Sequence, residues 1–197
     1  MAKVHPFHSF ETTCPFTSKQ ETFTIWMKSL ILNGNGCTVF DSQGQIVFRV
    51  DNYDIRCADE VFLMDQKGNV LFTILRKKYK FSRVWEGFRS SNDQKEPNFR
   101  VRSKGNRIHR EALTYEVKLG LEKNQPYSHR IECSTWKSSF CKISDQFGGL
   151  VAELRRKKAS CGVDLGEDVV SMVVEPNIDL SLIMGLVVAY CLINCKM

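Results

Sequence analysis

Lysine and arginine side chains have the clearest potential for binding chemistry in this sequence. Twelve of them lie between Arg76 and Arg110 against only three carboxylates, a local charge of +9 in a chain of formal net charge +6. Arg100 and Arg102 flank one residue, and a strand would direct both to the same face. We predict one anion-attracting face, made of Arg76, Lys77, Lys78, Arg100, Arg102, Arg155, Arg156, Lys157 and Lys158.

Several ligands would suit such a face. Anionic phospholipid head groups attract basic clusters, and nucleic-acid phosphates attract them through counterion release. Nucleic acid is the less favoured partner, because single-stranded binding would prefer exposed aromatic rings beside the cations. Two readings without an anionic ligand also stay open. The cations could simply keep a barrel exterior solvated, or the domain could bind another protein.

The sequence predicts no metal site and no cofactor. Its eight cysteines include no Cys-x-x-Cys pair, and none of its four histidines stands at zinc-finger spacing. The N-terminal segment MAKVHPFHSF lacks the apolar core of a signal peptide. We therefore expect an intracellular protein, cytoplasmic, membrane-associated or nuclear, whose thiols are reduced and buried rather than paired in disulfides.

Catalysis is not predicted either. The chain has no Gly-x-Ser-x-Gly elbow, no Walker loop and no His-Glu-x-x-His helix. Its histidines lie in polar stretches, without a cysteine or carboxylate at the spacing of a known catalytic motif. We expect a non-enzymatic protein without catalytic residues.

The elements that must position the basic residues are strands. From Phe23 onward, short alternating runs rich in β-branched and aromatic residues are separated by Gly, Asn and Asp, and about twelve such runs precede the C-terminal segment. Three similar segments, residues 40–50, 64–74 and 144–154, share an Asp-x-x-Gly turn. The aspartate can start each turn and the glycine can adopt positive φ. Repeated β-hairpins are therefore expected.

The C-terminal segment predicts a buried helix. Sixteen uncharged or capping residues, Ile178 to Ile193, would span about 24 Å as a helix, less than the roughly 30 Å of a bilayer core. Asp179 suits the N-cap, and small residues recur at Ser181, Gly185 and Ala189. No transmembrane span is expected. We predict a core helix over about 178–193, whose packed residues include Leu182, Gly185, Leu186 and Ala189.

The domain organisation follows from these patterns. Residues 1–22 are polar, with two prolines, and are expected to form a flexible arm. Residues 23–197 are expected to form a single domain, in which many antiparallel strands close around the hydrophobic C-terminal helix.

Several segments resemble the plant LURP-one-related proteins. The resemblance rests on WMKSLILNGNGCTVFDSQGQIVFRVDNYD (26–54), DEVFLMDQKGNVLFTILRKK (59–78), WEGF (85–88) and CKISDQFGGLVAELRRKK (141–158). An acidic stretch leading to DLSLIMGLVVAYCLI adds to it, so that about residues 23–193 are covered.

This resemblance implies a tubby C-terminal-like fold: an all-β barrel of roughly twelve antiparallel strands around a central hydrophobic helix. The family is related to phospholipid scramblases and tubby proteins, some of which hold phosphoinositides at a basic surface. It implies a binding or tethering protein at anionic membrane surfaces, in plant defence or stress responses. Membrane-tethered or nuclear DNA-associated regulators and protein–protein interaction modules are the alternatives.

Overall fold

Twelve strands and one helix make up the structure, a computed structural model that describes residues 18–28, 30, 35–52, 59–79, 82–90, 96–104, 112–120, 127–134 and 141–194. The strands are β1 (Glu21–Trp26), β2 (Asn35–Phe40), β3 (Ile46–Asn52), β4 (Glu60–Asp65), β5 (Val70–Tyr79), β6 (Ser82–Arg89), β7 (Phe99–Ser103), β8 (Ala112–Leu119), β9 (His129–Ser134), β10 (Cys141–Asp145), β11 (Leu150–Arg156) and β12 (Val169–Val174). The helix is α1 (Leu180–Ile193).

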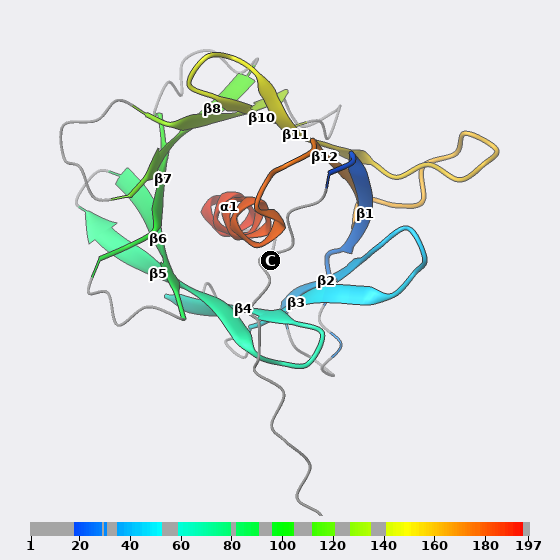
Figure 1. Ribbon diagram of the computed structural model, residues 1–197, viewed down its shortest axis with the longest axis horizontal. Helices are drawn as coiled ribbons and strands as arrows, with labels where there is room; N and C mark the ends of the chain where they lie inside the picture. The colour runs from blue at the N-terminus through cyan, green and yellow to red at the C-terminus, as the bar shows by residue number, and fades with distance from the viewer. Residues whose placement is uncertain are drawn as a thin grey trace, which may run out of the picture.

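The strands close into an antiparallel barrel around α1, as predicted (Figure 1). Every strand pairs with its neighbours in the chain, and β12 returns to pair with β1 over six residue pairs, from Glu21–Val174 to Trp26–Val169. β1 pairs with β2 over only three, from Thr24–Phe40 to Trp26–Thr38. The predicted arm, 1–22, falls mostly outside the described residues, and β1 begins inside its last two positions.

Alternation along the strands separates the core from the exterior. In β7, Phe99 and Val101 are buried while Arg100 and Arg102 are exposed, so the two arginines share the outer face, as expected. The inward residues of all twelve strands form one apolar core with α1. In this fold, residues on the outer face of neighbouring strands become surface neighbours even when they are far apart in the sequence.

The three Asp-x-x-Gly segments form the predicted hairpin turns. Oδ1 of Asp41 accepts backbone hydrogen bonds from Gln43 and Gln45, both at 2.8 Å, and Asp65 and Asp145 make equivalent bonds. The three glycines have φ angles of 77°, 87° and 86° at Gly44, Gly68 and Gly148. These φ values lie in the left-handed region that glycine adopts without steric cost.

The helix begins two residues later than predicted, at Leu180, because Asp179 is its N-cap. Oδ1 of Asp179 accepts hydrogen bonds from the backbone of Ser181 and Leu182 and from the Ser181 hydroxyl. Every residue of α1 except the partly buried Leu182 is buried. With 14 residues, α1 is about 21 Å long. Within the described part of the chain, no helix has the length and hydropathy to cross a membrane.

One side of α1 lies close to β5, β6 and β7. The ring of Phe99 fills the space between the helix and the barrel wall: a Cβ on Gly185 would lie 2.9 Å from this ring, and one on Gly87 only 2.1 Å away. Gly185, which we predicted to be packed in the core, therefore lies where only a small residue leaves room for the ring. Gly87 is a second position where only glycine leaves room for the same ring.

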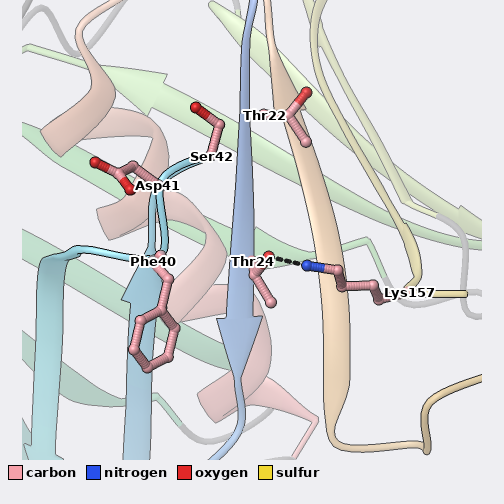
Figure 2. Close-up of a pocket in the computed structure, with 7 residues that line it drawn as sticks. Thr22, Thr24, Phe40, Asp41, Ser42 and Lys157 are labelled. Atoms are coloured by element: carbon pink, nitrogen blue, oxygen red, sulfur yellow. Dashed lines mark hydrogen bonds between the residues drawn. The ribbon is translucent and has the colours of Figure 1, made fainter. Parts of the chain in front are cut away.

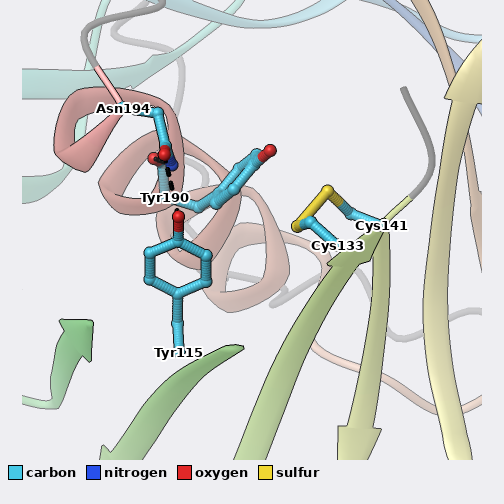
Figure 3. Close-up of a disulfide and its surroundings, with 5 residues drawn as sticks. All are labelled: Tyr115, Cys133, Cys141, Tyr190 and Asn194. Atoms are coloured by element: carbon cyan, nitrogen blue, oxygen red, sulfur yellow. Dashed lines mark hydrogen bonds between the residues drawn. A yellow bond between two sulfur atoms is a disulfide. The ribbon is translucent and has the colours of Figure 1, made fainter. Parts of the chain in front are cut away.

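The cysteines differ in part from the expectation. Cys37 and Cys191 are buried and not joined in a disulfide, as predicted, but Cys161, also outside any disulfide, is exposed. Cys133 and Cys141 are joined by a disulfide, although we expected reduced thiols throughout (Figure 3). The prediction failed because the register of β9 and β10, which places these two cysteines directly opposite each other, cannot be read from their spacing alone.

Candidate anion-binding surface

The predicted basic residues do not form one face. Arg76 to Lys78 lie on β5, and Arg155 and Arg156 lie on β11. Six steps around the barrel separate β5 from β11 in either direction, so the two runs lie on opposite sides of the molecule (Figure 1). The single nine-residue face is therefore wrong. The two hairpins resemble each other in sequence but are not neighbours in space.

A smaller cluster does form on the outer surface of β5 to β8. Lys77 on β5, Arg100 and Arg102 on β7, Lys104 directly after β7, and Lys118 on β8 share this side of the barrel. The strands are about 4.8 Å apart, so the cluster is roughly 15 Å wide. We call it the basic face, and it consists of Lys77, Arg100, Arg102, Lys104 and Lys118.

Two carboxylates lie beneath these cations. The side chain of Glu86 on β6 is only 3% exposed and is paired with Arg100 at 2.5 Å and with Lys77 at 3.5 Å. A buried carboxylate is costly unless it is paired and hydrogen-bonded. Arg100 and Lys77 meet that requirement for Glu86 while their side chains remain 44% and 47% exposed. The two cations therefore serve the fold and still face solvent.

Glu116 on β8, two strands away from Glu86, has the same role. Arg102 lies 3.0 Å and Lys104 3.2 Å from its carboxylate oxygens. Burial raises the pKa of Glu116, but hydrogen bonds from Tyr127, Arg102 and Lys104 outweigh burial, and the net pKa is lowered. Glu116 is therefore held in its charged form. Five cations over two carboxylates leave the basic face with a net charge of +3.

Tyr127 contacts two members of the basic face, Arg102 and Lys118. Its hydroxyl accepts a hydrogen bond from Arg102 at 2.7 Å, and Nζ of Lys118 lies 5.3 Å from its ring centroid. Sequence analysis assigned neither Lys118 nor Lys104 to a site. The alternation of Tyr115, Glu116, Val117 and Lys118 could have indicated that Glu116 and Lys118 point to the same side. Only the order of the strands places Lys118 beside Arg100.

Arg76 and Lys78 do not belong to the basic face. They alternate with Lys77 along β5 and pair instead with Asp59, which precedes β4, at 3.6 Å and 2.7 Å. The hydrogen bond from Lys78 is the main reason that the pKa of Asp59 is lowered. Asp59 thus offsets one of these two positive charges, at the end of the barrel where β4 begins.

The cations around β11 are dispersed. Arg155 pairs with Glu153 at 2.8 Å, and Arg156 pairs with Glu167 at 3.2 Å. Lys158 is exposed and forms an isolated bridge with Asp164 through its backbone. Nζ of Lys157 donates a hydrogen bond to the hydroxyl of Thr24 at 2.5 Å.

Lys157 borders a shallow surface groove of about 490 Å³. The groove lies over β1, where the β2–β3 turn diverges from it, and Figure 2 shows Lys157 reaching Thr24 at its border. Its lining is mixed in charge, with one ammonium and one carboxylate: Thr22, Thr24, Phe40, Asp41, Ser42, Gly44 and Lys157. It is therefore not an anion site of the kind predicted.

Comparison of the sequence with known proteins identifies its family. The profile of the LURP-one-related family matches residues 21–191, which is the whole barrel and nearly all of α1. The chain belongs to the LURP-one-related family. The LURP-one-related protein 11 of Arabidopsis thaliana is 43% identical over 99% of this chain and 90% of its own length. LURP-one-related proteins 2 and 3 of the same plant are each 41% identical over 100% of this chain and 94% of theirs.

A solved structure supports the fold of this LURP-one-related chain. An X-ray structure of a protein from Arabidopsis thaliana superposes with a TM-score of 0.61 over 88% of this chain and 90% of that one. Its sequence is 22% identical, so it shows the barrel with its central helix and nothing about ligands. Membership in the LURP-one-related family and the fold are thus established together.

Proposed function

We propose that this LURP-one-related protein is a non-enzymatic binding protein whose basic face docks on anionic, phosphoinositide-type membrane surfaces. One observation carries the proposal: five cations converge on β5 to β8 over two buried carboxylates, with a net charge of +3. Each Lys or Arg near an anionic bilayer contributes about 1 kcal/mol. A tethering role in plant defence or stress responses is the context that the family resemblance suggests.

The shape of the basic face favours a lipid surface over nucleic acid. The cations lie on the convex exterior of the barrel rather than in a groove that could follow a nucleic-acid backbone. Single-stranded nucleic acid would also use free aromatic rings for stacking. Among the described residues of this surface, the ring of Tyr127 already contacts Arg102 and Lys118.

The test must lower the positive charge of the basic face without placing another carboxylate beside the buried Glu86 and Glu116. Lys77→Gln, Lys104→Gln and Lys118→Gln together bring the net charge of the basic face to zero. Each buried glutamate keeps one arginine, because Arg100 remains on Glu86 and Arg102 remains on Glu116. A matched control carries Lys19→Gln, Lys67→Gln and Lys142→Gln, three exposed lysines outside the basic face.

Flotation with vesicles of phosphatidylcholine, with and without phosphatidylserine or a phosphoinositide, is the measurement. The native protein and the control variant should float with the anionic vesicles, and binding should weaken as salt rises. Loss of three cations removes up to about 3 kcal/mol, so the basic-face variant should bind roughly a hundredfold more weakly. Equal flotation of both variants, or none by the native protein, would refute the proposal. Binding of duplex DNA alone would favour nucleic acid.

A further inference from the structure

Two cysteines face each other across a single pair of strands. Cys133 on β9 and Cys141 on β10 are direct partners in the antiparallel register, and their sulfur atoms are joined. Both are buried and share the inner face with Ile131 and Ile143. They are the only residue pair joined by a disulfide in the described part of the chain.

This pair is the last described one at its end of the β9–β10 ladder. β9 ends at Ser134, one residue beyond Cys133, and β10 begins at Cys141 itself. The ends of secondary-structure elements open at a much lower free-energy cost than their middles. A redox partner could therefore reach the buried sulfur atoms through opening of one pair of residues, without unfolding of the barrel.

We propose that Cys133 and Cys141 form a reversible thiol–disulfide modification site whose redox state controls how tightly the last turn of α1 packs. In the oxidising direction, one thiolate attacks a small disulfide such as glutathione disulfide and forms a mixed disulfide. The second thiolate then displaces glutathione. The two protein thiols lose two protons and two electrons, and glutathione disulfide becomes two glutathione thiols. A dithiol reductant reverses the exchange and becomes a disulfide itself.

The connection to the helix runs through Tyr190. Figure 3 shows the Tyr190 side chain extending from α1 toward the disulfide. The Tyr115 ring packs edge-on against Tyr190, with centroids 5.2 Å apart. The Tyr115 hydroxyl donates to Oδ1 of Asn194, at the helix C-cap, at 2.8 Å. Bonded sulfur atoms lie about 2.05 Å apart, whereas separate thiols need van der Waals spacing. Reduction therefore demands more room on the inner face of β9 and β10, the side toward which Tyr190 extends.

The remaining described thiols serve as internal references. Cys37 and Cys191 are buried, and burial raises the pKa of Cys37, so that thiol stays protonated and reacts poorly. Cys161 is exposed and free. A general oxidation of accessible thiols would affect Cys161 first, whereas the proposed site responds as a pair.

The experiment uses the full native chain in glutathione buffers of graded reducing strength. After acid quenching and alkylation, trypsin should release Cys133 in IECSTWK (131–137) and Cys141 in SSFCK (138–142). The two peptides should be linked in oxidising buffer and separate after addition of a dithiol, without loss of the circular dichroism of the fold. Hydrogen exchange over residues 186–194 should be faster in the reduced protein.

Three results would overturn the proposal. The first is that the two peptides are never linked, or are linked to other cysteines. The second is a bond that excess dithiol breaks only when the protein unfolds. The third is equal hydrogen exchange in both redox states. Cys133→Ala with Cys141→Ala should show the same exchange in every buffer, because the pair that responds to the buffer is gone, while Cys161→Ser should respond like the native chain. If the double variant fails to fold, the native measurements alone decide.

Discussion

Replacing Gly87 by alanine tests whether the Phe99 ring is locked between the barrel wall and the helix. The added Cβ would lie 2.1 Å from two ring carbons, whereas carbon atoms in contact prefer about 3.5–4.0 Å. The ring would have to move by roughly 1.5 Å. The ring cannot move toward α1, since a Cβ placed on Gly185 would already lie 2.9 Å from it. Phe72 packs nearby, with ring centroids 5.5 Å apart.

The expected cost is that of overpacking, about 1–3 kcal/mol. Gly87 does not have the positive φ of the turn glycines, so alanine brings no backbone strain there. Alanine in a strand even recovers roughly 0.5–1 kcal/mol of the entropy cost of glycine. A net loss of about 1–2 kcal/mol should lower Tm by about 2–8 °C for a domain of this size.

Urea and thermal unfolding of four proteins would measure the effect: native, Gly87→Ala, Phe99→Leu and the double variant. If the clash with the ring is the cause, the double variant should lose at least about 0.5 kcal/mol less than the sum of the single variants. A Gly87→Ala protein as stable as the native one would refute the packing argument. Additive losses would show that the ring is not the obstacle.

Three further predictions concern the helix. Gly185→Leu should lower the free energy of unfolding by about 1–3 kcal/mol through overpacking against Phe99, and a raised Tm would contradict it. Removal of residues 178–197 should leave no cooperatively unfolding domain. Burying each large apolar side chain contributes about 1.5–3 kcal/mol, whereas the whole free energy of unfolding is typically about 5–15 kcal/mol. A soluble truncated protein that unfolds cooperatively would contradict this. Asp179→Asn should cost less than Asp179→Ala, which loses the cap at about 1 kcal/mol. Burial raises the pKa of Asp179, but hydrogen bonds from Ser181 and Leu182 and the charge of Arg89 outweigh burial, so the net pKa is lowered. The stabilisation from its charge is therefore present above the unfolded pKa of about 3.9 and lost as pH falls through the lower folded value. Unfolding measured from pH 6 to 2 should show a weaker pH dependence in Asp179→Asn, and an unchanged slope would contradict the assignment.

Local chemistry made much of the fold predictable. Asp41, Asp65 and Asp145 each start a turn with bonds to residues two and four positions on, so a few neighbouring residues determine the outcome. The cap at Asp179 and the buried helix follow from equally local patterns. The apolar character of the C-terminal segment already indicated that strands surround it, and the resemblance to a known family independently implied the same closed barrel.

The candidate surface was less predictable because it depends on which strands are neighbours. Arg100 could be placed on an outer face by alternation, but its partner Glu86 is 14 residues away in the sequence and lies on the next strand. The run at Arg155 resembles that at Arg76, yet the order of the strands puts them on opposite sides. The pairing of Cys133 with Cys141 depends in the same way on the register of β9 and β10, which the amino-acid composition and spacing do not reveal.

The closure of the barrel between β1 and β12 bears on how the chain can fold. Eleven of the twelve strand pairings join consecutive strands, and such hairpins can form as soon as both strands have been synthesised. The twelfth pairing joins Glu21 to Val174, and α1 follows it. Until then, the inner faces of the strands have nothing to cover them, and exposed apolar surface with an unpaired edge promotes aggregation. Folding should therefore be completed late, in a slow step set by long-range closure. Yield from recombinant expression should consequently depend on chaperones and temperature more than the stability of the finished barrel would suggest.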